Sequence, residues 1–126
     1  MVNDTIDILD AKIINIGIKF SIKSTQQENK YLALTQGIQA VKDKFNRKFE
    51  IGEPIYITDV QTALQSVSVI ADVKKVTIFN RVGGAYSDIS YDININKSSD
   101  GRYIIIPEDH IFEIKYPNID IVGNVL

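Results

Sequence analysis

The clearest pattern in the chain is the strict alternation of apolar and polar residues between Ile14 and Lys23. Successive side chains of a β-strand point to opposite faces of the sheet, so this alternation predicts a strand with one buried face. The positions expected on the buried face are Ile14, Ile16, Ile18, Phe20 and Ile22.

Apolar residues then recur every three or four positions, which predicts an amphipathic helix from about Gln26 to about Phe45. Thr25 and Glu28 match the capping box that often starts a helix. Gly37 costs such a helix about 1 kcal/mol relative to alanine. Either a close approach to the backbone of the sheet or tolerance at an exposed position explains it. The apolar stripe consists of Tyr31, Leu34, Ile38, Val41 and Phe45.

A second helix is expected near the middle of the chain. Residues 52–54 predict a turn before it and residues 55–57 a short extended segment. Thr58 and Asp59 can both accept hydrogen bonds from the free amides at a helix start. Residues 73–79, which are rich in β-branched side chains, predict a strand after it. The apolar positions with helical spacing are Val60, Leu64 and Val67.

The second half of the chain has weaker patterns. Residues 89–95 alternate between apolar and polar side chains, which predicts another strand. Residues 96–101 end in Asp-Gly and predict a hairpin turn, with residues 102–106 as the partner strand. Residues 111–116 alternate weakly, which favours a short strand that ends at a proline.

The last nine residues are unusually apolar for a chain end, where polar and frayed residues are the rule. An apolar end must be buried. It either completes the sheet of its own domain or pairs with a neighbouring chain, because strand exchange is a low-cost route to dimers. Both alternatives stay open at this point. The residues expected to contact another subunit are Ile119, Ile121, Val122, Val125 and Leu126.

These patterns predict an α+β fold with two helices packed on one face of a mixed, mostly antiparallel sheet. At 126 residues the chain has the length of a single domain. We expect residues 1–10 to form an N-terminal arm or linker, residues 11–117 to form a single α+β domain, and residues 118–126 to form the apolar tail.

Composition argues against several classes of function. The formal net charge is −2, so it gives no electrostatic case for binding nucleic acid or an anionic membrane. The chain has no cysteine, and its one histidine, His110, follows Glu108 and Asp109 in what is expected to be a solvated loop. We therefore expect no catalytic residue, no metal site and no cofactor, and the protein is not expected to be an enzyme.

The stretch from residue 49 to residue 79 resembles a stretch in the C-terminal region of the baseplate J-like proteins, wedge components of contractile-tailed phages. The order of a strand, a long helix, a turn, a capped helix and a strand over residues 8–80 is also similar. Ala71–Asp72 depart from the pattern, because the family often has a glycine just before the strand. The end of the chain, IFEIKYPNIDIVGNVL, looks like the end of large baseplate wedge subunits. The matching residues are Gly52, Ile55, Ile57, Asp59, Val60, Leu64, Val67, Val73, Val76 and Ile78.

This resemblance implies a structural component of a phage tail baseplate wedge. Such a protein would assemble with itself as a homo-oligomer and with other baseplate subunits. It would be found in the virion, and in the host cytoplasm during assembly. The alternative hypothesis is a stand-alone protein-binding adaptor that uses β-strand addition, which shares every feature except obligate self-association.

Overall fold

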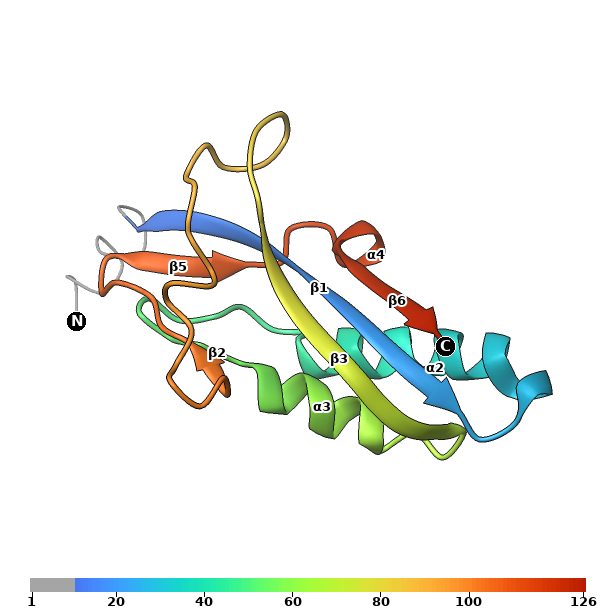
Figure 1. Ribbon diagram of the computed structural model, residues 1–126. Coiled ribbons are helices and arrows are strands. Elements are labelled where there is room, and N and C mark those ends of the chain that lie inside the picture. The colour runs from blue at the N-terminus through green and yellow to red at the C-terminus, as the bar shows by residue number, and fades with distance from the viewer. Residues whose placement is uncertain (1–10) are drawn as a thin grey trace.

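The computed structural model describes residues 11–126, so the expected arm at residues 1–10 lies outside the described residues. The long strand β1 (Lys12–Ser24) runs through the middle of the main sheet (Figure 1). Strand β3 (Ile70–Arg81) pairs antiparallel with one edge of β1 over almost its whole length. Two short strands share the other edge, both parallel to β1: β5 (His110–Glu113) and β6 (Ile121–Val125).

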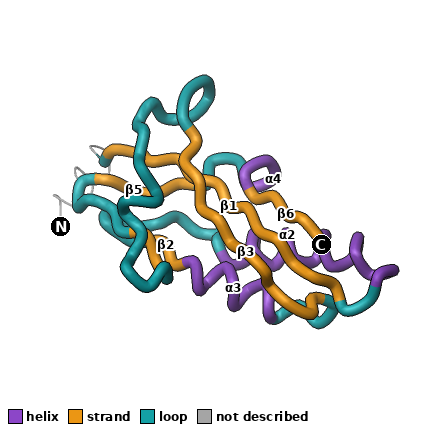
Figure 2. The backbone as a smooth tube through the Cα atoms, viewed as in Figure 1, coloured by secondary structure: helices purple, strands orange, loops and turns teal. Residues whose placement is uncertain are grey.

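Two helices lie on one face of this sheet, as Figures 1 and 2 show. They are α2 (Lys30–Lys44), preceded by the short 3-10 turn η1 (Gln27–Asn29), and α3 (Ile57–Gln65). The sheet is mixed, and its longest ladder, between β1 and β3, is antiparallel, so the predicted α+β fold is confirmed. Two further strands, β2 (Ile55–Tyr56) and β4 (Tyr103–Ile104), form a small antiparallel ladder. One short helix, α4 (Pro117–Asp120), was not expected.

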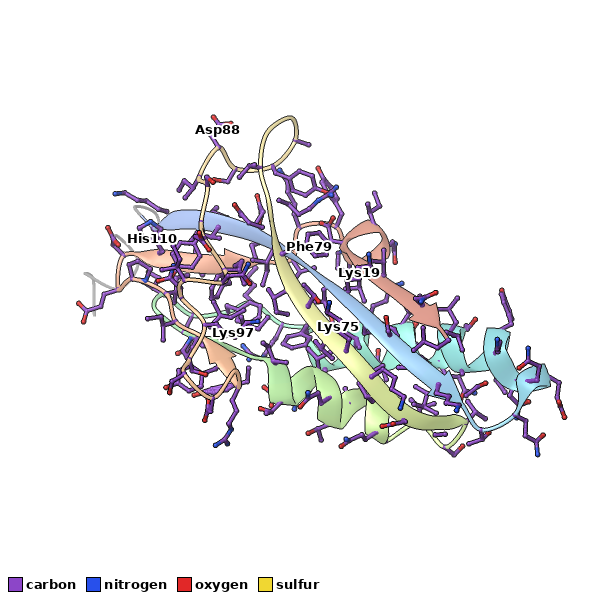
Figure 3. The ribbon with its side chains drawn as sticks, in the orientation of Figure 1. Lys19, Lys75, Phe79, Asp88, Lys97 and His110 are labelled. Carbon is purple, nitrogen blue, oxygen red and sulfur yellow. The ribbon has the colours of Figure 1, made fainter. Side chains whose placement is uncertain are left out.

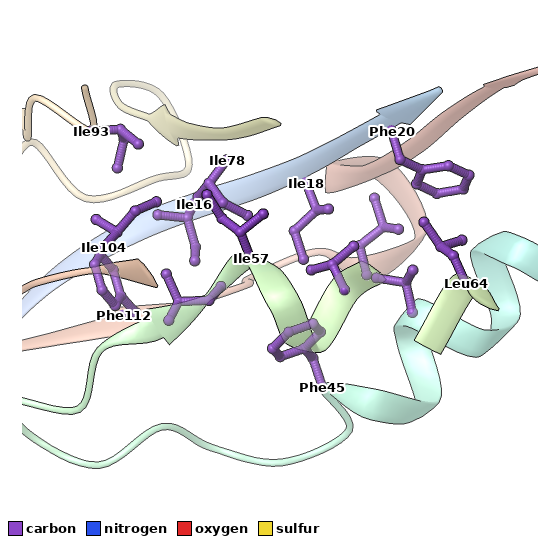
Figure 4. Packing of buried hydrophobic residues seen from close by; sticks show 14 of the residues in the cluster. Ile16, Ile18, Phe20, Phe45, Ile57, Leu64, Ile78, Ile93, Ile104 and Phe112 are labelled. Atoms are coloured by element: carbon purple, nitrogen blue, oxygen red, sulfur yellow. The ribbon is translucent and has the colours of Figure 1, made fainter. Parts of the chain in front are cut away.

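The alternation in β1 correctly predicts the buried face. Its five expected core residues are each at most 1% exposed and face the helices, as Figure 4 shows for Ile16, Ile18 and Phe20. The core continues through Leu64 on α3 and Phe112 on β5. Burying a side chain of this size contributes about 1.5–3 kcal/mol, so the strand and helices stabilise one another mainly through this layer.

The buried stripe of α2 differs from the predicted one. Val41 is buried as expected, but Tyr31 is 80% exposed, and Ala33 and Gly37 are buried in the stripe instead. A Cβ on Gly37 would lie 3.3 Å from both Ile70 Cδ1 and Leu64 Cδ2. Gly37 is therefore not a tolerated surface glycine, and the atoms that approach it are side chains of β3 and α3 and not the expected sheet backbone.

Neither predicted capping arrangement is present. Helix α3 begins at Ile57, one residue before Thr58, and has no side-chain cap. The amide of Ile57 instead donates to the carbonyl of Arg102 at 2.8 Å, so a neighbouring backbone segment satisfies the first free donor. The amide of Thr25 similarly donates to the carbonyl of Val69 at 2.9 Å. Because these tertiary hydrogen bonds satisfy local backbone groups, the predicted caps at Thr58, Asp59 and Thr25 are wrong.

The strand predicted at residues 89–95 is also wrong, because residues 89–92 are irregular and residues 93–95 form a turn (Figure 2). Side chains satisfy its backbone: the amide of Tyr91 donates to Asn80 Oδ1 at 2.9 Å, and the amide of Ile95 donates to Asp92 Oδ1 at 3.0 Å. Ile93 is 8% exposed, but Ile95 is 79% exposed. Ile89 and Tyr91 also pack against the core, so the alternation here reflects side chains anchored on the core and not a strand.

Strand β3 begins at Ile70, so Ala71 and Asp72 lie within the strand and not in a turn before it. The strand predicted at residues 102–106 is limited to the two residues of β4, which pair with β2. The turn before it exists, with Gly101 at a φ of 73°. That conformation favours glycine, as expected for an Asp-Gly turn.

Candidate functional site: the C-terminal edge of the sheet

The C-terminal segment completes the sheet of its own domain. After β5 the chain turns through α4, where the amides of Ile119 and Asp120 both donate to the carbonyl of Tyr116. It then returns beside β1 as β6, with Ile121 opposite Ile18 and Val125 opposite Ile22. Of the two alternatives for the apolar end, intramolecular pairing is the one observed. The boundary expected at residue 117 thus does not separate a tail from the domain.

A buried carboxylate, Asp120, links the C-terminal segment to Arg81 on β3. Its side chain is fully buried, and Oδ1 accepts a hydrogen bond from the Tyr86 hydroxyl at 2.8 Å. Arg81 Nε on β3 lies 3.2 Å from the same oxygen, and the Tyr116 amide donates to Oδ2 at 3.3 Å. A buried charge is tolerated when it is paired and hydrogen-bonded in this way. Asp120 therefore fixes the position from which β6 starts.

Arg81 is held between two partners. Its Nη2 donates to the Tyr86 hydroxyl at 3.0 Å, and its guanidinium lies 4.7 Å from the centre of the Tyr86 ring. The hydrogen bond with Tyr86, together with the charge of Asp120, raises the pKa of Arg81 above its ordinary value. No motif in the sequence marks this group. The only available signal was a single acidic residue within an otherwise apolar chain end.

The five residues predicted to contact another subunit are placed differently from one another. Ile121 is 2% exposed and belongs to the core of its own chain, so its assignment as an intersubunit contact is corrected. Its side chain faces the helices because it shares a register position with Ile18. Val125 is half-buried on the same face. The remaining three are exposed: Ile119 at 61%, Val122 at 39% and Leu126 at 55%. We call Ile119, Val122 and Leu126 the C-terminal apolar patch.

The outer edge of β6 has no strand partner among residues 11–126. The Leu126 amide donates to the Ile22 carbonyl at 2.8 Å, toward β1. Peptide groups alternate in direction along a strand, so the amides of Gly123 and Val125 point to the other edge. Such a row of backbone donors and acceptors is a ready template for another strand.

Helix α2 supports β6 from the inner face and does not cover this edge. A Cβ on Gly123 would lie 2.9 Å from Leu34 Cδ1, and Lys42 Nζ donates to Asn118 Oδ1. These two contacts show that α2 runs antiparallel to β6, behind it in the view of Figure 1. The first turn of the helix, with the exposed Tyr31, therefore lies toward the Leu126 end of the strand.

His110 makes local contacts at the start of β5. Its Nδ1 lies 2.6 Å from Asp109 Oδ1, and its carbonyl accepts from the Gly52 amide at 2.8 Å. The hydrogen bond with His110 lowers the pKa of Asp109. Within residues 11–126, no group of three or more His, Cys, Asp or Glu side chains is arranged to hold a metal ion.

No helix in the described part of the chain has the length and apolar character needed to cross a membrane. Comparison of the sequence with models of known protein families and with curated proteins finds no match.

Proposed function

We propose that this chain is a structural assembly module that associates with copies of itself through the outer edge of β6 and the C-terminal apolar patch. The observation that carries the proposal is an edge strand whose outer side has no strand partner within residues 11–126, together with the exposed Ile119, Val122 and Leu126. Backbone hydrogen bonds along the edge would supply affinity, and the apolar side chains would supply specificity. The proposed role needs no catalytic residue, cofactor, nucleic acid or membrane.

The assembly we propose is the baseplate wedge of a contractile-tailed phage, in which the chain would contact both itself and other wedge subunits. The support for this context is the resemblance of residues 49–79 to the baseplate J-like proteins. The residues that carry the resemblance have structural roles here: Val60 and Leu64 are fully buried, and Gly52 has a φ of 76°. In this proposal the central segment builds the scaffold and the C-terminal edge makes the contact.

Two copies related by a twofold axis would place two β6 edges side by side in an antiparallel arrangement. Each residue of the C-terminal apolar patch would then contribute to the interface from both copies, because a twofold interface uses the same surface on both partners. Five residues make a short edge, so the apolar side chains must contribute much of the affinity, at about 25 cal/mol per Å² of apolar surface buried.

A second candidate function uses the same edge. As a stand-alone adaptor, the chain would accept a strand from a different protein and stay monomeric on its own. The observation that favours this alternative is the small size of the edge, since five residues are enough for a peptide strand. Oligomeric state distinguishes the two functions.

The test is light scattering coupled to size-exclusion chromatography on the full chain, compared with two edge variants. Val125→Pro removes a donor that points outward, and proline is tolerated on the open side of an edge strand. Val122→Lys places a charge in the apolar patch. Val125→Thr and Val122→Thr are the matched controls, because both keep the backbone donor and a β-branched side chain.

We expect a dimer or larger species for the full chain and for both threonine controls, and a folded monomer for the proline and lysine variants. Circular dichroism would establish that each variant is folded. A full chain that is monomeric at all concentrations would overturn self-assembly and favour the adaptor. Assembly that both edge variants leave intact would place the contact elsewhere on the molecule.

A further inference from the structure

The outer face of the main sheet, opposite the helices, is covered over only half of its length. Near the start of β1 the loop after β3 folds over it: the Ser87 amide donates to Asn15 Oδ1 at 2.7 Å, and the ring of Phe79 lies over Gly17. Farther along β1 the face is open. A shallow hollow of about 590 Å³ is found there, lined by Lys19, Phe20, Ser21, Lys75, Thr77 and Asn124.

The hollow carries two lysines on adjacent strands. Lys19 is opposite Thr77 and Lys75 is opposite Ser21, so the two amines are diagonal neighbours on the same face (Figure 3). Both residues are exposed, and no acidic side chain within residues 11–126 forms an ion pair with either. The nearest carboxylate on β3, Asp72, is 2.9 Å from Lys74 Nζ. An acidic ligand would therefore relieve the repulsion between Lys19 and Lys75.

The chain itself contains a segment of the required charge. Residues 1–10 include Asp4, Asp7 and Asp10 and no lysine or arginine, although the whole chain has 14 basic and 16 acidic residues. Without these ten residues the formal charge changes from −2 to +1. The acidic excess of the chain is thus concentrated in the arm, and a basic hollow lies on the sheet.

Chain length decides which copy this arm can reach. Lys19 is eight residues beyond Ala11, or about 26 Å along a strand at about 3.3 Å per residue. A fully extended path from Ala11 carries Asp7 only about 14 Å and Asp10 about 4 Å. In its own chain, therefore, only Asp4 approaches the hollow, and only at full extension. The hollow of a second copy is not subject to this limit on distance, so all three carboxylates can reach it.

We propose that the acidic arm, residues 1–10, of one copy binds in the basic hollow around Lys19 and Lys75 of a second copy. The inference rests on the proposed function in that both require self-association, but it uses the outer face of the sheet, which adjoins the edge of β6 at Asn124. In this arrangement the arm of one copy would contact the outer face of the main sheet in its neighbour. It would thereby link copies in a second direction, which a twofold contact at β6 cannot do alone.

The test is a charge-swap mixing experiment on the full chain, followed by analytical ultracentrifugation. In the arm variant Asp4, Asp7 and Asp10 are all changed to Lys, and in the hollow variant Lys19 and Lys75 are both changed to Glu. Each variant alone has an arm and a hollow of the same sign, so its arm-mediated association should weaken by about tenfold or more, as like charges face each other. In an equimolar mixture both arm–hollow pairings between the two variants are complementary, and association should return.

The matched control is the double variant Lys48→Glu and Lys97→Glu, which makes the same change of charge at two exposed lysines outside the hollow. It should associate as the unmodified chain does. Raising the salt from about 0.05 M to about 0.5 M should weaken the arm contact, because the screening length between exposed charges falls to a few ångströms.

The two proposals fail in different ways. If the mixture associates no better than either variant alone, or if the control weakens association equally, the arm contact is overturned. Loss of association in Val125→Pro together with indifference to the charge variants would support the β6 edge and overturn the arm. The opposite pattern would support the arm and overturn the β6 edge, and a monomeric full chain would overturn both.

Discussion

The ring of Phe79 on β3 lies directly over Gly17 on β1, at the centre of the sheet's outer face. A Cβ on residue 17 would be 2.7 Å from Phe79 Cε2 and 2.8 Å from the backbone carbonyl oxygen of Asp120. The glycine is required because β3 on one side and the start of β6 on the other both close over it. Residue 17 therefore couples the C-terminal segment to the sheet.

The first prediction is that Gly17→Ala lowers the free energy of unfolding by about 2 kcal/mol, which is typical of overpacking at a tight site. Urea denaturation followed by circular dichroism would measure it. Ser21→Ala, on the open part of the same face, is the control and should stay within about 0.5 kcal/mol of the unmodified chain. Changing Phe79 to Leu in addition should restore only part of the loss, since the Asp120 carbonyl is backbone and cannot move aside. An alanine at residue 17 as stable as glycine would contradict this packing.

The second prediction concerns the buried carboxylate. Asp120→Ala leaves Arg81 and the Tyr86 hydroxyl without their partner and should lower the free energy of unfolding by about 3 kcal/mol. Tyr86→Phe removes two hydrogen bonds, the one accepted from Arg81 Nη2 and the one donated to Asp120 Oδ1, and should cost about 2 kcal/mol. In a double-mutant cycle the two changes should be strongly non-additive, because both act on the contact between Tyr86 Oη and Asp120 Oδ1. Additive costs would show that this hydrogen bond contributes little to stability.

The sequence predicted those parts of the fold that depend on a long regular pattern. The five alternations of β1 located its buried face, since one register places Ile14, Ile16, Ile18, Phe20 and Ile22 toward the helices. The helical periods located α2 and α3. Before α2, residues 27–29 form the 3-10 turn η1, so the α-helix begins only at Lys30. The start of α3 was misplaced because the Arg102 carbonyl, distant in sequence, accepts the free amide of Ile57. Local capping rules contain no information about such partners.

The candidate site was harder to predict. The apolar residues at the chain end were recognised, but the sequence could not separate the buried Ile121 from the exposed Val122, because that depends on the register of β6 with β1. The cluster of Arg81, Tyr86 and Asp120 joins residues up to 39 positions apart through hydrogen bonds and charge. No periodic pattern marks it.

The third prediction concerns pH. Arg47 pairs with Glu53 through two contacts, Nη1 to Oε1 at 3.1 Å and Nη2 to Oε2 at 2.9 Å, and the Glu50 amide donates to Oε1 at 2.8 Å. Partial burial raises the pKa of Glu53, but these hydrogen bonds and the charge of Arg47 outweigh it. The pKa of Glu53 therefore lies below its ordinary value of 4.5.

A carboxylate with a lowered pKa contributes stability above its ordinary pKa and loses that contribution as the pH falls through its folded-state value. The Arg47 side chain is 47% exposed, so solvent limits the pair to about 0.5–1 kcal/mol. At pH 7, Arg47→Gln should therefore be less stable than the unmodified chain by this amount, and at about pH 2 the difference should disappear. Urea denaturation at both pH values would measure this difference in the free energy of unfolding. Lys48→Gln is the control, and its stability should equal that of the unmodified chain at both pH values. A difference that persists undiminished in acid would assign the effect of Arg47 to its packing over the Phe49 ring, 5.0 Å away.

The fourth prediction tests the attachment of β6 to the core. A Cβ on Gly123 would lie 2.5 Å from Phe20 Cζ and 2.9 Å from Leu34 Cδ1, so an alanine there must displace a ring that is 1% exposed. Gly123→Ala should lower the free energy of unfolding by about 1–3 kcal/mol. All three of the nearest atoms belong to side chains, and a smaller residue at position 20 can therefore relieve the collision. In the Phe20→Leu background the alanine should cost at least about 1 kcal/mol less than in the unmodified chain, as measured by a double-mutant cycle. An equal cost in both backgrounds would mean that the clash is with backbone and that β6 is held by hydrogen bonds to β1 more than by packing.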